Sequence, residues 1–397
     1  MYRRKLSAGL VVGAMALVGL GVSGGVAHAA PPTLPGPSVF TLPLPVPLAV
    51  TVATGPGGAI TDVSVGAPVD PLAPVVVDPA APAAPVVDPA ITVSKARAGR
   101  VVFTTDADGV KVSIRSKGQS QSLTARADSI DAFLNPDGGS WAGEVFPGVQ
   151  GVVPYIIGGT ADAPTITVDK SGIKGGGTAA DPVTKVDDDG EEISVRVVVT
   201  FTSPDGLQTR DLSIRLKVEN ESDDDDDDDS SDGHASLSIT LGKIRGAVGK
   251  AVAGPQNWGA VLCDESAGTI TYDVAALVGT ISNVHAFVDG TEVVDARINV
   301  EGNKADVRFP TGERIRIRVS VDAAGLLTIN VSEKIRCRDA EAPTVNGEVV
   351  PVTDDSVDDD HGDDHGGDNQ GGRHGGGDQG GDNEGGGHGG DDKKSDD

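Results

Sequence analysis

Residues 219–234 read ENESDDDDDDDSSDGH, with seven consecutive aspartates, 223–229, at the centre of the stretch. An unpaired carboxylate in a protein interior carries a large desolvation cost, so this stretch must lie in solvent. Segments on both sides of it alternate apolar and polar residues, which is typical of β-strands with one buried face. We therefore predict two β modules, over residues 49–218 and 235–339, joined by an acidic disordered linker over 219–234.

The first module shows the alternation most clearly near its two ends. Apolar residues at 110, 112 and 114 alternate with polar ones, and the same holds for 212, 214, 216 and 218. The sequence Ser203-Pro204-Asp205-Gly206 favours a turn, so 193–202 and 207–219 are expected to pair as a hairpin. A second hairpin is expected within 49–65, followed by a Pro/Ala/Val-rich loop over 66–90. The only helical segment we predict here is short, 129–134, capped by Asp128.

The second module contains several short strands with glycine-bearing turns and no long helical crossover. The predicted strands are 260–263, 269–277, 284–288, 292–300, 304–309, 314–321 and 326–338. Before them, Leu241, Ile244, Val248 and Val252 have helical spacing, although the glycines between them weaken a helix. The fold class predicted for the chain is mostly β, with two antiparallel sandwich-like or barrel-like domains. Disordered segments are expected at both ends, Pro-rich and extended over 30–48 and Asp/Gly/His-rich over 340–397.

The N-terminus predicts export. Basic residues at 3–5 precede an apolar run over 6–26 and then Ala27-His28-Ala29, the small-residue pattern of a signal peptidase site. A cleaved signal peptide over 1–29 predicts a secreted or cell-surface protein without a membrane span after cleavage. Retention of the apolar run as an anchor is the alternative, because the run is nearly long enough to cross a bilayer.

Two cysteines, Cys263 and Cys337, are the only ones in the chain. Export would place them in an oxidising compartment, where a pair of cysteines normally joins. We predict a disulfide between them, two free buried thiols being the alternative.

Two segments of the second module carry basic residues at every second position. These residues are Arg314, Arg316 and Arg318 in the first segment and Lys334, Arg336 and Arg338 in the second. If the two strands are neighbours, their outward faces form one cationic surface. Such a surface suits an anionic envelope polymer or the chain's own acidic segments. Solvated outer faces are the simpler interpretation.

Glu333 has the parity of the apolar residues Ile329, Val331 and Ile335, so a regular strand directs it into the core. Burial there raises the pKa of a carboxyl group and makes it a candidate for acid–base chemistry. A β-bulge, or a strand that runs past the end of its sheet, is the alternative.

The acidic segments suggest weak, multi-site cation binding, to calcium through carboxylates or to zinc through imidazoles. The candidate ligands are Asp223, Asp225, Asp227, Asp229, His361 and His365. Their spacing defines no closed site, and an inert solvating role is the alternative. No other cofactor is indicated.

The usual enzyme signatures are absent from the sequence. The net charge of −27 and the lack of aromatic residues between the arginines argue against a nucleic-acid partner. The function expected is that of an exported, non-catalytic structural or binding protein with two β modules and flexible acidic segments. A carboxylate-based hydrolase that acts on a cell-envelope polymer is the alternative, because a pair of acidic residues leaves no reliable trace in a sequence.

Overall fold

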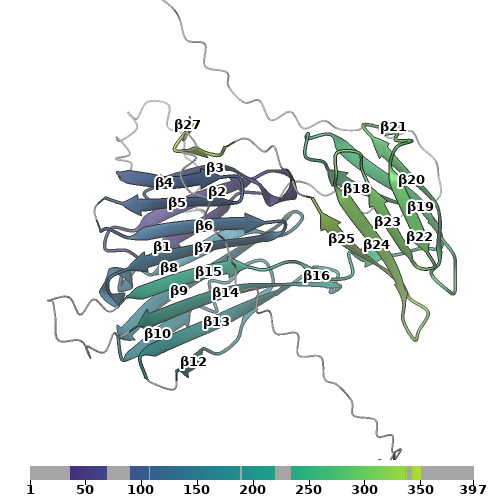
Figure 1. Ribbon diagram of the computed structural model, residues 1–397. Coiled ribbons are helices and arrows are strands. Elements are labelled where there is room, and N and C mark those ends of the chain that lie inside the picture. The colour runs from purple at the N-terminus through teal and green to yellow at the C-terminus, as the bar shows by residue number, and fades with distance from the viewer. Residues whose placement is uncertain are drawn as a thin grey trace, which may run out of the picture. The chain divides into compact units, whose positions relative to one another are not determined.

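The computed structural model describes residues 36–68, 90–106, 108–187, 190–219, 234–335, 337 and 342–349. These residues form a mostly β structure of four sheets, with two short 3-10 helices (Figure 1). All of them belong to one unit by their contacts. The predicted signal peptide, the loop over 69–89, the aspartate run and the C-terminal tail lie outside the described residues.

Two sheets, A and B, enclose the first of two hydrophobic cores. Sheet A has the strand order β10-β9-β8-β1-β2-β3-β26-β27, and sheet B the order β11-β13-β14-β15-β7-β6-β5-β4, with β12 and β16 beside it. The strands of sheet A are β1 (Ser38–Leu42), β2 (Leu48–Thr54), β3 (Ile60–Gly66), β8 (Gly139–Phe146), β9 (Val149–Thr160), β10 (Ala163–Val168), β26 (Thr344–Val345) and β27 (Glu348–Val349). Those of sheet B are β4 (Ile91–Arg97), β5 (Arg100–Thr105), β6 (Lys111–Lys117), β7 (Ser120–Ala127), β11 (Gly177–Ala179), β12 (Val183–Val186), β13 (Glu192–Thr202), β14 (Gln208–Glu219), β15 (Ala235–Leu241) and β16 (Arg245–Gly246).

The alternation in the sequence accounts for this first core. In β14, Leu212, Ile214 and Leu216 are fully buried while the residues between them reach solvent. Trp141 from sheet A and Phe201 from sheet B meet inside, with ring centroids 6.1 Å apart. The predicted hairpin around Ser203–Gly206 is confirmed, because β13 and β14 pair in register from Glu192–Glu219 to Thr202–Thr209.

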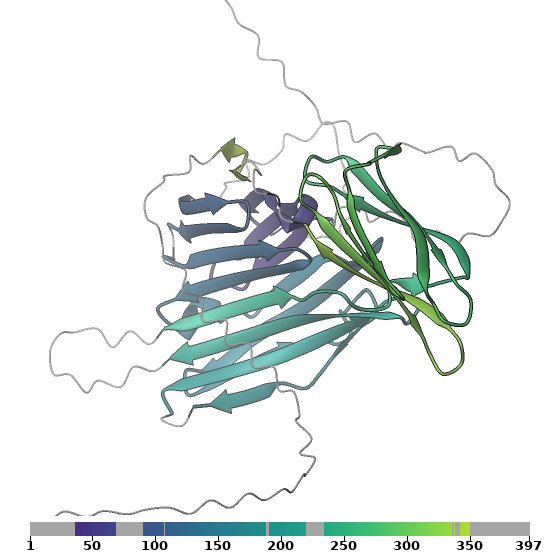
Figure 2. The ribbon, with the colours of Figure 1, turned by 45° about the vertical axis from the view of Figure 1, so that its right-hand side comes forward.

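The aspartate run connects two neighbouring strands of one sheet. β15 pairs with β14 on one side and with β7 on the other, and the views in Figures 1 and 2 agree on this. The backbone N–H of Glu219 donates to the carbonyl of His234, 2.8 Å away, so the strands meet at the base of the acidic segment. The start predicted for the second module at 235 is therefore wrong. A solvent-exposed acidic stretch suits a hairpin loop as well as a linker.

Two further segments extend the first core beyond its predicted limits. The Pro-rich stretch 30–48 contains β1, which pairs with β2 and β8 and buries Phe40 and Leu42. The tail predicted from 340 onward contains β26, whose Val345 joins the same core and whose backbone pairs in parallel with β3. Both predictions of disorder were wrong at these positions because short strands can be completed by partners far away in the chain.

Sheets C and D enclose the second core. Sheet C has the order β17-β25-β24-β23-β22 and sheet D the order β18-β19-β20-β21. Their strands are β17 (Gly249–Lys250), β18 (Gly254–Val261), β19 (Ala267–Val274), β20 (Ile281–Val288), β21 (Thr291–Glu292), β22 (Arg297–Glu301), β23 (Lys304–Arg308), β24 (Arg314–Val321) and β25 (Leu327–Lys334). Trp258, Tyr272 and Phe309 are the large aromatic side chains of this core. The antiparallel prediction is confirmed for both sheets.

The helical predictions need correction. Residues 241–252 form the end of β15 and the short strands β16 and β17, since the glycines at 242, 246 and 249 disfavour a helix. The two 3-10 helices are η1 (Pro56–Gly58) and η2 (Ile130–Phe133). The second lies where a short helix was predicted, but its cap is Ser129, whose hydroxyl accepts from the N–H of Asp131, and not Asp128.

Candidate functional site

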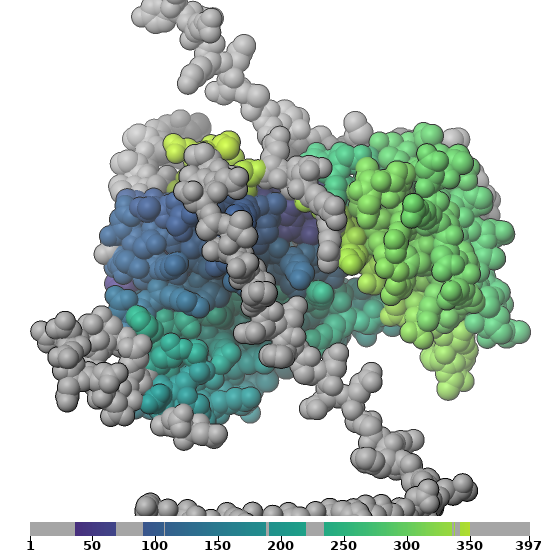
Figure 3. Space-filling model, viewed as in Figure 1, coloured from purple at the N-terminus to yellow at the C-terminus, as the bar shows by residue number. Residues whose placement is uncertain are grey.

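The outer face of sheet C gathers the predicted basic residues. β24 and β25 are neighbours, and Arg314 lies directly opposite Lys334. The register carries this row on through Arg308 of β23 to Arg297 of β22, so four cations lie side by side across four strands. Side chains of β24 and β25 form part of the visible surface in Figure 3. Arg336 and Arg338 lie outside the described residues.

Counted over β22–β25, the outward positions hold seven basic side chains and two acidic ones. The basic residues are Arg297, Lys304, Arg308, Arg314, Arg316, Arg318 and Lys334, and the acidic ones are Asp306 and Glu301. The face therefore has an excess of five positive charges in a chain whose net charge is −27.

Asp306 organises two of these arginines. Its carboxylate accepts from Nε of Arg314 at 2.7 and 2.9 Å and from Nη2 of Arg316 at 3.2 Å. The Arg314 guanidinium, helped by Arg316, holds the pKa of Asp306 below its usual range. A carboxylate that binds two guanidinium groups holds them in place without cancelling the charge of the face.

Glu333 points to the inner side of sheet C, as its parity predicts, and lies opposite Ile315. No register shift is recorded between β24 and β25, so the β-bulge alternative does not apply. Burial raises the pKa of this carboxyl group. The indole N–H of Trp258 lies near enough to offset part of that rise, yet it does not complete a hydrogen bond.

We expect Glu333 to make stability depend on pH. Since its pKa in the folded protein exceeds the unfolded value of about 4.3, the folded state holds more protons between the two values. The free energy of unfolding contributed by this group is therefore highest below about pH 4.3 and falls as pH rises toward the folded-state pKa. Glu333→Gln removes the cost of ionisation and should be more stable than the natural protein at pH 7.

Urea unfolding at pH 4, 5.5 and 7 measures this effect, with the exposed Glu348→Gln as the matched control. The gain in the free energy of unfolding for Glu333→Gln should shrink toward zero at pH 4. Glu348→Gln should have the same stability as the natural protein at all three pH values. Equal curves for the two variants would contradict a partly buried Glu333 whose pKa is raised.

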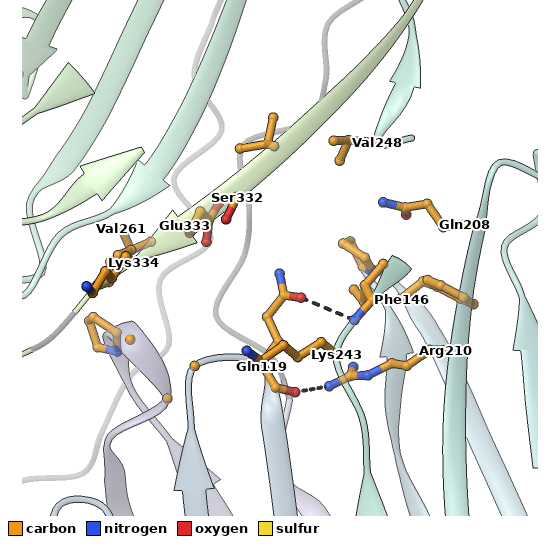
Figure 4. Close-up of a pocket in the computed structure, with 18 of the residues that line it drawn as sticks. Gln119, Phe146, Gln208, Arg210, Lys243, Val248, Val261, Ser332, Glu333 and Lys334 are labelled. Carbon is orange, nitrogen blue, oxygen red and sulfur yellow. Dashed lines mark hydrogen bonds between the residues drawn. The ribbon is translucent and has the colours of Figure 1, made fainter. Parts of the chain in front are cut away.

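A cavity of about 550 Å³ adjoins Glu333. Figure 4 shows Ser332, Glu333 and Lys334 of β25 on one side of it and Gln119, Lys243 and Arg210 on the other. The cavity is lined by residues of both cores and of the segment 241–248 that follows β15. This cavity could not be predicted from the sequence, because its walls come from segments that are distant in the chain.

Arg210 is the buried charged group at this cavity that the sequence analysis missed. Only 6% of it is exposed, and its guanidinium donates to the carbonyls of Gly242 (2.8 Å), Glu144 (3.1 Å), Val145 (3.1 Å) and Gln119. Burial lowers the pKa of Arg210 to about 10, which leaves it charged at neutral pH. Four of its five N–H groups donate to backbone carbonyls, so it acts mainly as a structural clamp.

Other acidic side chains near the cavity and the disulfide are also satisfied. The two oxygens of Glu144 accept from the N–H groups of Gly36 (2.7 Å) and Gly148 (2.5 Å). Buried Glu313 accepts from the N–H of Cys263 (2.9 Å) and from the hydroxyl of Thr311. The predicted pairing of Cys263 with Cys337 is confirmed, with sulfur atoms 2.13 Å apart.

The predicted cation ligands at 223, 225, 227, 229, 361 and 365 all lie outside the described residues. Within the described ranges, no group of three or more His, Cys, Asp or Glu side chains could hold a metal ion.

The comparisons with known proteins add no family. No family model, no curated protein and no solved structure matches this chain. Within the described part of the chain, no helix has the length and apolar character needed to cross a membrane.

Proposed function

We propose that this chain is an exported, non-catalytic structural or binding protein that holds an anionic envelope polymer on the outer face of sheet C. The observation that carries this proposal is the unbroken row of Arg297, Arg308, Arg314 and Lys334 across four paired strands. Neighbouring strands lie about 4.8 Å apart, so the row presents a cation at regular short intervals. A polymer with repeated phosphate, sulfate or carboxylate groups matches this spacing.

The overall acidity of the chain does not oppose such binding at close range. At physiological ionic strength the Debye length is about 8 Å, so charges beyond the face are largely screened from a polymer lying on it. Arginine side chains suit this role because their planar guanidinium groups bind phosphate and carboxylate in bidentate geometry.

The hydrolase alternative requires two carboxyl groups that face each other across a substrate site. Of the two acidic residues that line the cavity, Glu144 has both oxygens bound by backbone N–H groups, which leaves Glu333 alone. Glu313, which directly precedes β24, is buried and hydrogen-bonded. This arrangement favours a binding role over hydrolysis.

Binding of dextran sulfate, compared with uncharged dextran, tests the proposal. We expect the triple variant Arg297→Gln/Arg308→Gln/Arg318→Gln to bind dextran sulfate about tenfold more weakly at 150 mM salt, given about 0.2–1 kcal/mol per exposed ion pair. The natural protein should lose affinity steeply as salt rises, because binding releases counterions.

A matched control variant removes three positive charges from a different sheet. Arg97→Gln/Lys111→Gln/Arg115→Gln changes three exposed cations of sheet B and should leave dextran sulfate binding nearly unchanged. If both triple variants weaken binding equally, the interaction follows net charge and the sheet C face is not the binding site.

A further inference from the structure

The cavity beside Glu333 has the size and walls of a small-ligand site. Its volume of about 550 Å³ lies within the ~300–1,000 Å³ typical of ligand pockets, which occur preferentially between structural modules. This site is separate from the outer face of sheet C. Among its lining residues, only Ser332 and Lys334 of β25 also belong to that face.

One part of the cavity wall is apolar. It includes Phe146 at the end of β8, Ile244 and Val248 in the segment after β15, and Val331 and Ile335 in and after β25. The last four are partly buried and pack at the edges of the two cores. Burial of an alkyl chain against such a wall is worth about 0.8 kcal/mol per CH₂ group.

The charged groups that are free to meet a ligand are mostly cationic. Lys117, Lys243 and Lys334 line the cavity and are exposed. No hydrogen bond or ion pair is recorded for these three lysines within the described residues. Arg210 and Glu144 are already held by backbone groups, as described above. Lys243 and Glu333 approach the cavity from opposite sides in Figure 4.

Trp258 closes part of the cavity wall, with only 7% of its surface exposed. Its buried indole N–H lies near the Glu333 carboxyl group and partly offsets the rise in pKa that burial causes there. Trp258 therefore adds a rigid apolar surface to the cavity, while its N–H serves Glu333.

We propose that this cavity binds a small amphiphilic carboxylate, with its alkyl chain against Phe146, Ile244 and Val248 and its head group at Lys117 and Lys243. Two acidic groups line the cavity, and the charge of Glu144 is offset by the nearby Arg210, which leaves Glu333 as the main group that would oppose such an anion. Because burial raises its pKa, this carboxyl group accommodates the anion more readily than an exposed glutamate would.

Isothermal titration of the full chain with decanoate, decanol and decylamine tests the proposal. The three probes share one alkyl chain and differ only in the charge of the head group. We expect saturable binding of decanoate below its micellar concentration, weaker binding of decanol and the weakest binding of decylamine. Absence of saturable decanoate binding, or decylamine binding as tight as decanoate, would overturn the proposal.

Two variants locate the site. Lys117→Gln/Lys243→Gln should weaken decanoate binding roughly threefold to tenfold and leave decanol unchanged, as expected for two exposed charges. Val248→Phe should weaken both probes by filling the apolar end. Thermal melts confirm that each variant is folded, and the lysine variant keeps the test decisive if Val248→Phe does not fold. Unchanged decanoate binding in the folded variants would place the ligand elsewhere and reject the site.

The same variants separate this site from the proposed polymer face. Neither Lys117 nor Lys243 belongs to sheet C, so Lys117→Gln/Lys243→Gln should bind dextran sulfate like the natural protein. The sheet C triple variant should in turn bind decanoate normally. If one proposal fails, the other is still tested by its own measurement.

Discussion

Replacing Arg210 by methionine should lower the free energy of unfolding of the first core by about 3 kcal/mol, because several carbonyls lose a charged donor and each buried polar group left unsatisfied costs about 1–3 kcal/mol. Methionine fills a similar volume but donates no hydrogen bond. The carbonyls of Gly242, Glu144, Val145 and Gln119 would then lose their shared donor. These carbonyls come from sheet A, from the β6–β7 turn and from the end of β15, so one side chain ties three segments together.

Urea unfolding followed by the fluorescence of Trp141, in the core beside Phe201, measures this loss. Arg215→Met is the matched control, because Arg215 lies on the same strand but is exposed and forms a 3.3 Å ion pair with Glu192. That variant should change stability by less than about 1 kcal/mol. Arg210→Lys should recover only part of the loss, since an ammonium group lacks the guanidinium fork. Equal losses at 210 and 215 would show that the buried hydrogen bonds carry little stability.

The double variant Cys263→Ser/Cys337→Ser should destabilise the second core by about 4 kcal/mol. The disulfide closes a loop of sequence separation 74, and the chain-entropy model assigns about 4–5 kcal/mol to a loop of that length. It joins the residues that follow β18 in sheet D to those that follow β25 in sheet C. Reduction should therefore loosen the packing of one sheet on the other.

Unfolding monitored through Trp258, which lies in the second core, reports this change. Adding a thiol reductant to the natural protein should reproduce the midpoint of the double variant, and the same reductant should leave the variant itself unaffected. If the reduced natural protein kept its midpoint, the disulfide would add nothing beyond what the core already supplies.

Period-two alternation predicted individual strands well, because it records directly which side chains face an interior. The predicted strand 314–321 matches β24 (Arg314–Val321). The inward direction of Glu333 followed from the same rule. The same alternation would also have predicted that Arg210 is buried, because it shares one face of β14 with Leu212 and Ile214.

The alternation pattern could not predict which strands pair with each other. Nothing in Ala235–Leu241 says that it pairs back onto β14 and not forward into the next sheet, since both neighbours would bury the same face. The cavity and the hydrogen bonds of Arg210 depend on such distant pairings. The basic residues of β24 and β25 could be predicted from the sequence. Only the register of the paired strands shows that Arg308 and Arg297 continue the row.

The late strand β26 has a consequence for how the chain is made. Val345 pairs with Val63, and Thr344 bonds to Asp62, 282 positions earlier in the chain. During synthesis from the N-terminus, β3 must therefore wait with one free edge until sheets C and D have emerged from the ribosome. An open strand edge is a template for pairing with other chains. A nascent chain stalled before residue 344 should thus be more prone to self-association than the finished protein.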